Sequence, residues 1–164
     1  HAELSIEYLF NEKHINDFNI PVKYHQTIET AIRNHNKYEI EDNLSDKNLY
    51  FAKLIRDIDK IDIFRQEAVF LELVIDSDLS ENVKKSFDNH ELIKNENIIN
   101  NTDATVHELA YVFNIYFKES YELLNETDNL ELLLSTIHVK KGYEELFENI
   151  KNELRRFIKE RIEN

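Results

Sequence analysis

The chain contains no cysteine and no methionine, and it has only one glycine, Gly142, and one proline, Pro21. Without cysteine it forms no disulfide. Hairpins and tight turns usually need glycine at positive φ, so the shortage of glycine argues against a β-rich fold. No apolar run approaches the length of a membrane span, and no basic segment followed by an apolar one marks a signal peptide. These absences predict an all-α protein that is cytoplasmic and stays out of membranes.

The sequence contains no methionine, and its first residue is His1. Two explanations stay open. The chain is a fragment of a longer protein, or modified methionines were dropped when the sequence was written out. In the second case some of the spacings used below are short by one residue.

The residues that are present suit one acidic helical domain. The chain has 164 residues, of which 41% are apolar and 32% charged, and its formal net charge is −13. Such a polyanion is a poor partner for a nucleic acid polymer or an anionic membrane surface. A small phosphorylated molecule or a nucleotide is compatible with this charge, because a bound metal ion reverses the local field.

Apolar residues recur at helical spacing along most of the chain. The clearest stripe lies after Gly142 and includes Leu146, Ile150, Leu154 and Phe157. Ser45 is placed to cap the longest helix. The helices expected from these patterns cover residues 2–13, 22–36, 46 to about 73, 81–89, 102–124 with Thr102 or Asp103 as cap, 128–137 and 143 onwards. Residues 76–164 are expected to pack on residues 1–75 within one domain.

Reactive polar groups coincide with an apolar helix face at two places. His35 follows Ile32 by three residues, which turns its imidazole toward the core. Such a histidine is more often a hydrogen-bonded core residue than a metal ligand. Asp59 and Asp62 border the stripe of the long helix, where a buried carboxylate needs a cation, a metal or several donors. A helix edge with ordinary salt bridges is the alternative.

The segment from Ala31 to Lys37, followed by a polar loop and the residues Phe51 to Ile63, resembles a stretch of the HD-domain metal-dependent phosphohydrolases. In that family a histidine precedes the loop, and a helix with an Asp-Lys-hydrophobic-Asp pattern supplies the last metal-binding aspartate. The resemblance covers residues 1–65. The adjacent His-Asp pair that names the family occurs nowhere in this sequence.

The resemblance implies an HD-type helical bundle with additional C-terminal helices and a site for a divalent metal, either Mn, Fe, Zn, Ni or Mg. It implies His1, His35 and Asp59 as metal ligands, with Asp62 in support. Arg33 and Lys60 are the expected substrate-binding cations, whereas Arg56 is expected on the solvated surface.

The leading function is therefore hydrolysis of a phosphoester in a small molecule or nucleotide, provided that the parent protein holds the His-Asp pair upstream. The alternative is a catalytically inactive HD-like module for binding or regulation. His107 begins a sequence like a zinc-protease helix, but Tyr111 stands where the second histidine belongs. Asp103 and His107 are expected as a cap and a surface residue. His14, His25, His90 and His138 receive no role.

Overall fold

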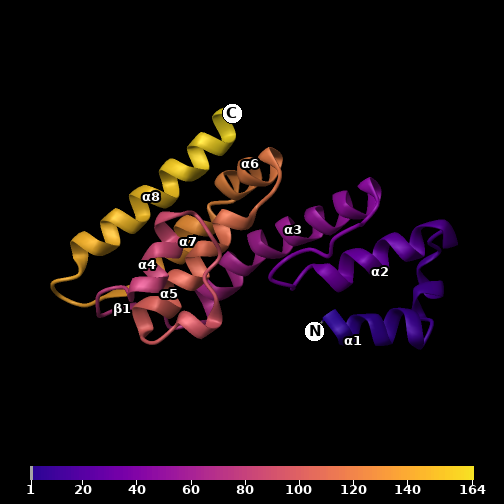
Figure 1. Cartoon of the computed structure of the whole chain (residues 1–164), viewed down its shortest axis with the longest axis horizontal. Helices are drawn as coiled ribbons and strands as arrows, with labels where there is room; N and C mark the ends of the chain where they lie inside the picture. The colour runs from indigo at the N-terminus through magenta and orange to yellow at the C-terminus, as the bar shows by residue number, and fades with distance from the viewer. Residues whose placement is uncertain (1) are drawn as a thin grey trace. The chain divides into compact units, whose positions relative to one another are not determined.

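Helices make up nearly all the regular structure of the chain, as the shortage of glycine and proline predicts (Figure 1). The structure is a computed structural model that describes residues 2–164. Its α-helices are α1 (Ala2–Ile6), α2 (His25–Asn34), α3 (Asp46–Phe70), α4 (Glu81–Asp88), α5 (Asn101–Leu109), α6 (Lys118–Glu126), α7 (Asn129–Thr136) and α8 (Glu144–Glu163). The predicted all-α class is confirmed. Among the described helices, none combines the length and apolar character that crossing a bilayer requires.

The only sheet in the described residues is a single parallel pair of two-residue strands. β1 (Val74–Ile75) pairs with β2 (His138–Val139), with Val74 opposite His138. The Thr105 hydroxyl donates to the Val74 carbonyl at 2.9 Å, which ties α5 to this pair. The sheet therefore fastens two loops together and does not form a layer of its own.

The chain forms two compact units, residues 1–59 and 60–164. The division falls inside α3, between Asp59 and Lys60. Each unit is described separately below.

The first unit contains α1, α2 and the first part of α3. α1 packs against α2 and continues into a π-helical turn at Glu7–Asn11. A 3₁₀ turn at Val22–Tyr24 precedes α2, so the helix expected over 22–36 has an irregular start. Ser45 accepts a hydrogen bond from the Asn48 amide at 3.3 Å, as expected for the cap of α3. The buried apolar side chains of this unit are few and mostly small: Ala2, Ile6, Ile15, Ala31 and Ala52.

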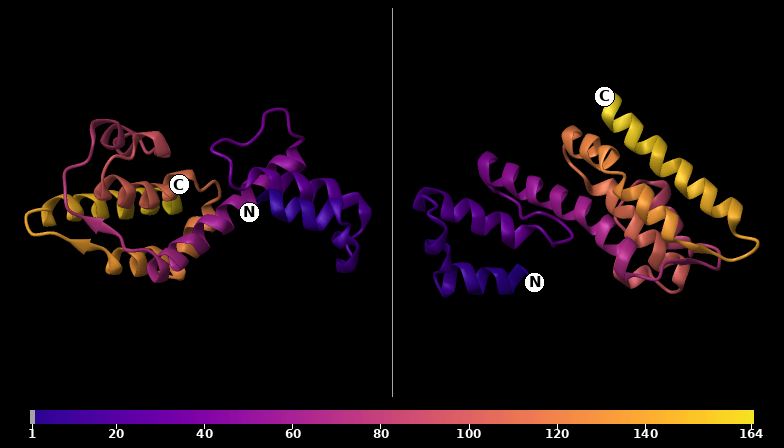
Figure 2. Two further views of the ribbon diagram at one scale, coloured as in Figure 1. Left: turned by 90° about the horizontal axis from the view of Figure 1, so that it is seen from below. Right: turned by 180° about the vertical axis from the view of Figure 1, so that it is seen from behind.

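The second unit has the larger hydrophobic core. α4 packs on α5, α5 packs on β1, and α6 packs on α7 and on α8, which runs along one side of the unit (Figures 1 and 2). Its fully buried apolar side chains include Phe64, Ile75, Val83, Val106, Leu109, Val112, Leu133 and Leu154.

The helix expected from residue 102 to Leu124 is interrupted, and this prediction is wrong. α5 ends at Leu109, a 3₁₀ turn follows at Ala110–Asn114, and α6 begins at Lys118. The Tyr121 hydroxyl stabilises the break by donating to the carbonyls of Val112 (3.1 Å) and Ile115 (3.0 Å). The Tyr121 hydroxyl reaches these two carbonyls only once the chain has folded. The break is therefore not marked in the sequence, which has no glycine or proline there.

The predicted cap of α5 is also wrong. Asn100 is the capping residue, and its side chain accepts from the Asp103 amide at 2.7 Å. Asp103 instead lies fully buried and accepts from the amides of Ser80 (2.9 Å) and Ile99 (3.2 Å). Its carboxylate thus joins the start of α4 to the loop before α5.

The apolar stripe of α8 faces the core as predicted. Ile150, Leu154 and Phe157 are buried, and Leu146 packs against the core at its edge. Glu148 and Lys159 are exposed, as expected. Lys151 is only partly exposed because its stem lies over the Phe147 ring, with Nζ 4.8 Å from the centroid.

Replacing Leu154 by alanine should lower the free energy of unfolding by about 2–5 kcal/mol, because the side chain is fully buried and its loss leaves a cavity. Urea denaturation followed by circular dichroism measures the change. The exposed Lys159 on the same helix is the matched control, and its alanine variant should shift stability by less than about 0.5 kcal/mol. Equal effects of the two substitutions would contradict the packing described for α8.

Candidate functional site

His35 directly follows α2, and one hydrogen bond orients its ring. Nδ1 lies 2.6 Å from the carbonyl oxygen of Ile32. A carbonyl oxygen only accepts, so Nδ1 carries the hydrogen and the ring lone pair of the neutral side chain lies on Nε2. Histidines that bind metals commonly use one nitrogen for the metal and donate the other N–H to a carbonyl or carboxylate. The ring of His35 is therefore in the tautomer that metal binding through Nε2 requires.

The loop after His35 is fastened to α3 by Arg56. Its Nη1 donates to the carbonyls of Asn34 (2.9 Å), His35 (3.4 Å) and Lys37 (2.5 Å), and its Nη2 reaches the Tyr38 carbonyl at 3.3 Å. The residue is only 1% exposed, so the expectation of a solvated Arg56 is wrong. The physical reason is that α2 ends without a glycine cap, and its last carbonyls need donors from elsewhere.

Asn34 completes this connection from the other side. Its side chain is fully buried, donates to the Thr30 carbonyl at 2.8 Å and accepts from the Glu41 amide at 2.9 Å. Asn34 and Arg56 together hold both ends of the loop that carries His35. Neither role could be predicted from the sequence, because both depend on contacts between different segments of the chain.

The carboxylates of α3 differ in burial. Asp57 is fully buried, whereas Asp59 is half-buried. Asp59 lies three residues after Arg56, one helical turn further along the same side of α3. Asp62, in the second unit, pairs with Arg65 at 3.2 Å. The sequence ranked Asp59 and Asp62 as the carboxylates nearest the apolar face, and it missed the deeper burial of Asp57.

The predicted substrate-binding cations lie in different surroundings. Arg33 is exposed and pairs with Glu29 on the next turn of α2, with Nη2 2.7 Å from Oε1. Lys60 belongs to the second unit and is buried. An exposed pair such as Arg33–Glu29 contributes little to stability, so an anionic ligand could replace Glu29 at small cost.

No three His, Asp or Glu side chains within residues 2–164 form a group suited to hold a metal ion. His1, one of the three predicted ligands, lies outside the described residues. Of the other two predicted ligands, His35 directly follows α2 and Asp59 lies on α3.

Comparison with known proteins identifies no relative. No family model, curated protein or solved structure matches the chain. Its function is therefore argued from its own residues.

A second polar cluster lies in the other unit, between α3 and α5. Burial, together with a hydrogen bond to Glu108 and the charge of that residue, raises the pKa of Glu67 to about 9. Burial alone would raise the pKa of Glu108, but hydrogen bonds from His107 and Glu67 outweigh it and lower that pKa. The pair therefore holds one proton, on Glu67. The other oxygen of Glu67, Oε2, is buried and accepts no hydrogen bond within the described residues.

His107 belongs to this cluster, so its predicted surface position is wrong. The residue is buried, with Nδ1 3.1 Å from Oε1 of Glu108 and its ring edge-on to Tyr111 at 5.2 Å. Asp103, one turn earlier, is occupied with the amides of Ser80 and Ile99. The sequence showed His107 next to Glu108 but not Glu67, which is 41 positions away from Glu108 and reaches it only through folding.

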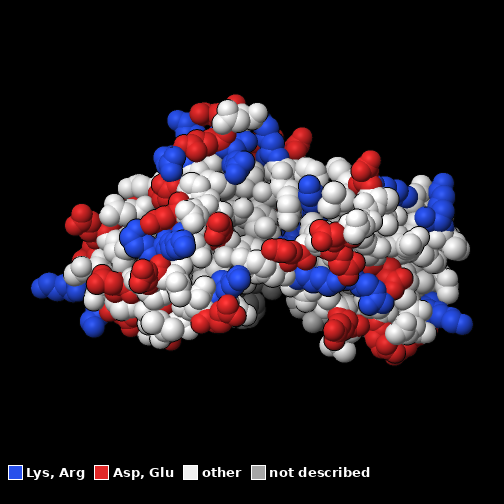
Figure 3. Space-filling view, in the orientation of Figure 1, with Lys and Arg blue, Asp and Glu red and all other residues white. Residues whose placement is uncertain are grey.

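The surface of the chain mixes the two signs of charge. On the face shown in Figure 3, acidic side chains lie among basic ones over both units. Many of these are neighbours on one helix, such as Lys84 with Asp88 and Arg156 with Glu160. The pattern is that of a solvated surface.

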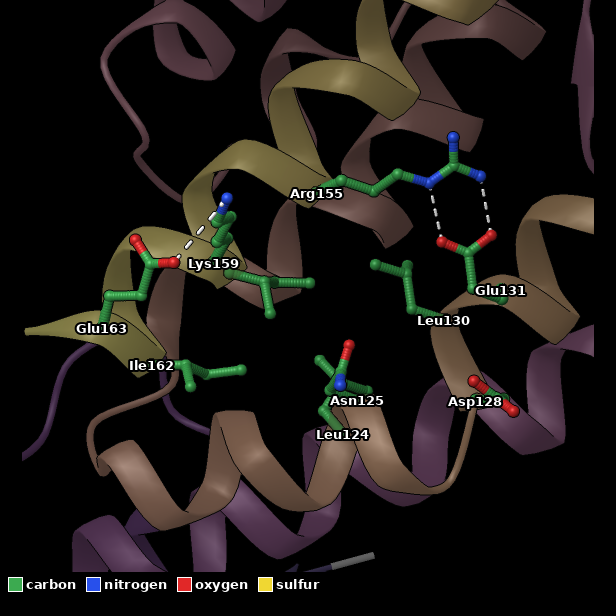
Figure 4. A pocket seen from close by; sticks show the side chains of 10 residues that line it. Leu124, Asn125, Asp128, Leu130, Glu131, Arg155, Lys159, Ile162 and Glu163 are labelled. Atoms are coloured by element: carbon green, nitrogen blue, oxygen red, sulfur yellow. Dashed lines mark hydrogen bonds and ion pairs between the residues drawn. The ribbon is translucent and has the colours of Figure 1, made fainter.

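Two hollows differ sharply in lining. In the first unit a groove of about 430 Å³ between α2 and α3 is lined almost wholly by apolar side chains, among them Ile28, Ile32 and Ile55. In the second unit a pocket of about 340 Å³ has an apolar floor and a charged rim (Figure 4). Arg155 and Glu131 form a two-fold hydrogen-bonded pair across that rim, with both contacts at 2.7 Å. A second ion pair, Lys159 with Glu163, neutralises two more of the rim charges, and Asp128 leaves the lining slightly acidic.

Proposed function

We propose that the chain belongs to a metal-dependent phosphohydrolase and that His35 and Asp59 bind the metal ion. One observation carries the proposal. Arg56 fastens the His35 loop to α3 one turn before Asp59, and the His35 ring donates through Nδ1 so that Nε2 carries the lone pair. The resemblance of residues 31–63 to the HD-domain phosphohydrolases points to the same two residues independently.

The donor types fit a divalent metal ion. Imidazole nitrogen and carboxylate oxygen together suit Mn, Fe, Zn, Ni or Mg. When bound, such an ion lowers the pKa of a coordinated water and supplies a nucleophile for attack on phosphorus. On the protein side, Arg56 keeps the His35 loop in place, and its four backbone acceptors give that loop little freedom to move.

The substrate proposed is a phosphoester of a small molecule or nucleotide. Arg33 is the candidate for holding phosphate oxygens, because a guanidinium donates two parallel hydrogen bonds to such a group. It would exchange Glu29 for the phosphate in doing so. Lys60 follows Asp59 directly in α3 and is the second candidate.

Metal analysis of the native protein, expressed from its complete coding sequence, tests the metal site. His35→Ala should lower the bound metal at least about tenfold, since a lost ligand or its supporting contact typically costs that much affinity. Asp88→Asn is the matched control, because Asp88 is an exposed aspartate that pairs with Lys84 and has no place in the proposed site. Equal metal content in the native protein and the His35 variant would remove His35 from the site.

A second candidate function is a catalytically inactive helical module that binds a partner. The apolar groove between α2 and α3 favours it, because Phe51 and Ile58 on its wall are 41% and 54% exposed. An amphipathic helix is the kind of partner that fits a groove between helices. Native protein that binds no divalent metal and hydrolyses no phosphoester would favour this module over the enzyme.

A further inference from the structure

A third hollow, in the second unit, combines aromatic walls with cations that lack acidic partners. It measures about 460 Å³ and is lined by His90, Tyr116, Lys118, Phe157 and Arg161. This volume lies within the range of ordinary small-molecule sites. The hollow lies wholly in residues 60–164 and is separate from the metal site proposed above.

The charges of this hollow distinguish it from the rest of the surface. Arg155, Arg156 and Lys159 on α8 each pair with a glutamate. Lys118 and Arg161 form no ion pair within the described residues, although the chain has 33 acidic residues for 20 lysines and arginines. Two exposed cations therefore face one hollow with their charge available to a ligand.

Glu160 also lines the hollow, but its carboxylate is already engaged. It accepts from Nη1 of Arg156 at 2.7 Å. This contact partly neutralises the one acidic side chain that faces the space. The balance of charge inside the hollow is therefore positive, in contrast to the net charge of the whole chain.

His90 is held in an unusual conformation beside these cations. Its φ of 57° lies in the left-handed region, which non-glycine residues adopt rarely and which concentrates at functional positions. The ring lies against Phe113 (4.9 Å) and Phe157 (4.7 Å), and Nε2 is 2.5 Å from Oε1 of Glu153. Contacts with two aromatic rings and at one nitrogen thus fix the imidazole at the edge of the hollow.

The aromatic groups offer a flat surface for a ring. The Arg161 guanidinium lies 4.8 Å above the Phe157 ring, and Tyr116 is 38% exposed. Planar heterocycles stack on tyrosine and on arginine planes with little dependence on their identity. The hollow therefore supplies cationic donors for an anion and a face for a planar ring.

We propose that this hollow binds a small ligand that carries both a planar ring and a phosphate, the chemical class of a mononucleotide. Lys118 and Arg161 bind the phosphate, and Tyr116 stacks on the ring. A nucleic acid polymer is a poor alternative, because an acidic protein repels its many phosphates.

Equilibrium titration of the full chain with AMP, at low ionic strength and without metal, tests the proposal. Binding of AMP should be saturable. The variant K118Q/R161Q should bind AMP at least about tenfold more weakly, because two charge-assisted contacts are lost. Both side chains are exposed, so the variant should keep its fold, which circular dichroism checks. K141Q is the control, since Lys141 is exposed and lies outside the hollow, and it should bind AMP as the native chain does.

Adenosine and inorganic phosphate serve as the two half-ligands. Each should bind at least about tenfold more weakly than AMP, because each makes only one of the two kinds of contact. Absence of saturable AMP binding, or unchanged AMP binding by K118Q/R161Q, would overturn the proposal. Adenosine binding as tight as that of AMP would remove the role of the cations, and phosphate binding as tight would remove that of the ring.

Discussion

Replacing Arg56 by alanine should lower the free energy of unfolding of the first unit by about 3–5 kcal/mol, because a buried hydrogen-bonded charge is removed and its acceptors are left unpaired. Four backbone carbonyls lose their donor at once, from Asn34 to Tyr38. The small apolar core of this unit offers little to offset the loss. Urea denaturation followed by circular dichroism should show an early transition that the native chain lacks.

Arg33 provides the matched control for Arg56. It is also an arginine of the first unit, but it is exposed and bonded only to Glu29 one turn away. Its alanine variant should lose about 0.3–0.5 kcal/mol. A variant Arg56→Lys keeps the charge but not the planar fork, so its stability should lie between those of the native chain and Arg56→Ala. Similar stabilities of the alanine variants at 33 and 56 would contradict the structural role of Arg56.

Replacing Glu67 by glutamine should remove a large pH dependence of stability. The pKa of Glu67 in the folded chain is about 9, above its ordinary value of 4.5. The folded state therefore binds more protons than the unfolded state between these values, and stability falls as pH rises through this interval. The titration of one proton changes the free energy of unfolding by at most about 1.4 kcal/mol per pH unit. Glutamine keeps a donor for Glu108 and does not titrate.

The difference in stability between the native chain and Glu67→Gln, measured by denaturation at several pH values, isolates this group. Glu41, Glu131 and Glu153 have lowered pKa values and act in the opposite direction at acid pH, but they are common to both chains. The native chain should lose stability relative to the variant as pH rises from about 5 to about 9. The exposed Glu145→Gln variant should follow the native curve. A pH-independent difference would show that the proton is not held on Glu67.

The sequence predicted the parts of the fold that depend on local pattern. The stripe of α8 and the Ser45 cap follow from spacing and residue type within one turn or a few, and both are confirmed. The break after α5 was not predicted because the Tyr121 hydroxyl stabilises it. That hydroxyl can bond to the carbonyls of Val112 and Ile115 only when the chain bends between α5 and α6.

The polar interior shows the same limit more clearly. Arg56 and Asp103 are buried side chains with hydrogen-bond partners on other segments, and helical spacing assigned neither of them to the interior. Spacing reports which side of a helix is apolar. It does not show where another helix ends and leaves backbone carbonyls without donors. Arg56 lies in the interior of the first unit because it donates to such carbonyls after α2.

Asp57 must be separated from Asp59 in any functional experiment. Asp57 lacks the position of Asp59 in the Asp-Lys-hydrophobic-Asp pattern, so the family resemblance alone predicts a mild effect of Asp57→Ala. The full burial of Asp57 now predicts a loss of stability for that variant, which would lower activity indirectly. Asp88→Asn is the better control, because Asp88 lies on the surface beside Lys84.

Hydrolysis of a phosphoester by the native protein, assayed with added Mn²⁺ or Mg²⁺ and compared with its Asp59→Ala variant, tests the central proposal most directly. The proposal predicts metal-dependent hydrolysis by the native protein and by the control variant Asp88→Asn. It predicts that Asp59→Ala abolishes the hydrolysis while the variant stays folded, as judged by circular dichroism. Metal-dependent activity that persists in a folded Asp59→Ala variant, or a native protein with no such activity, would contradict it.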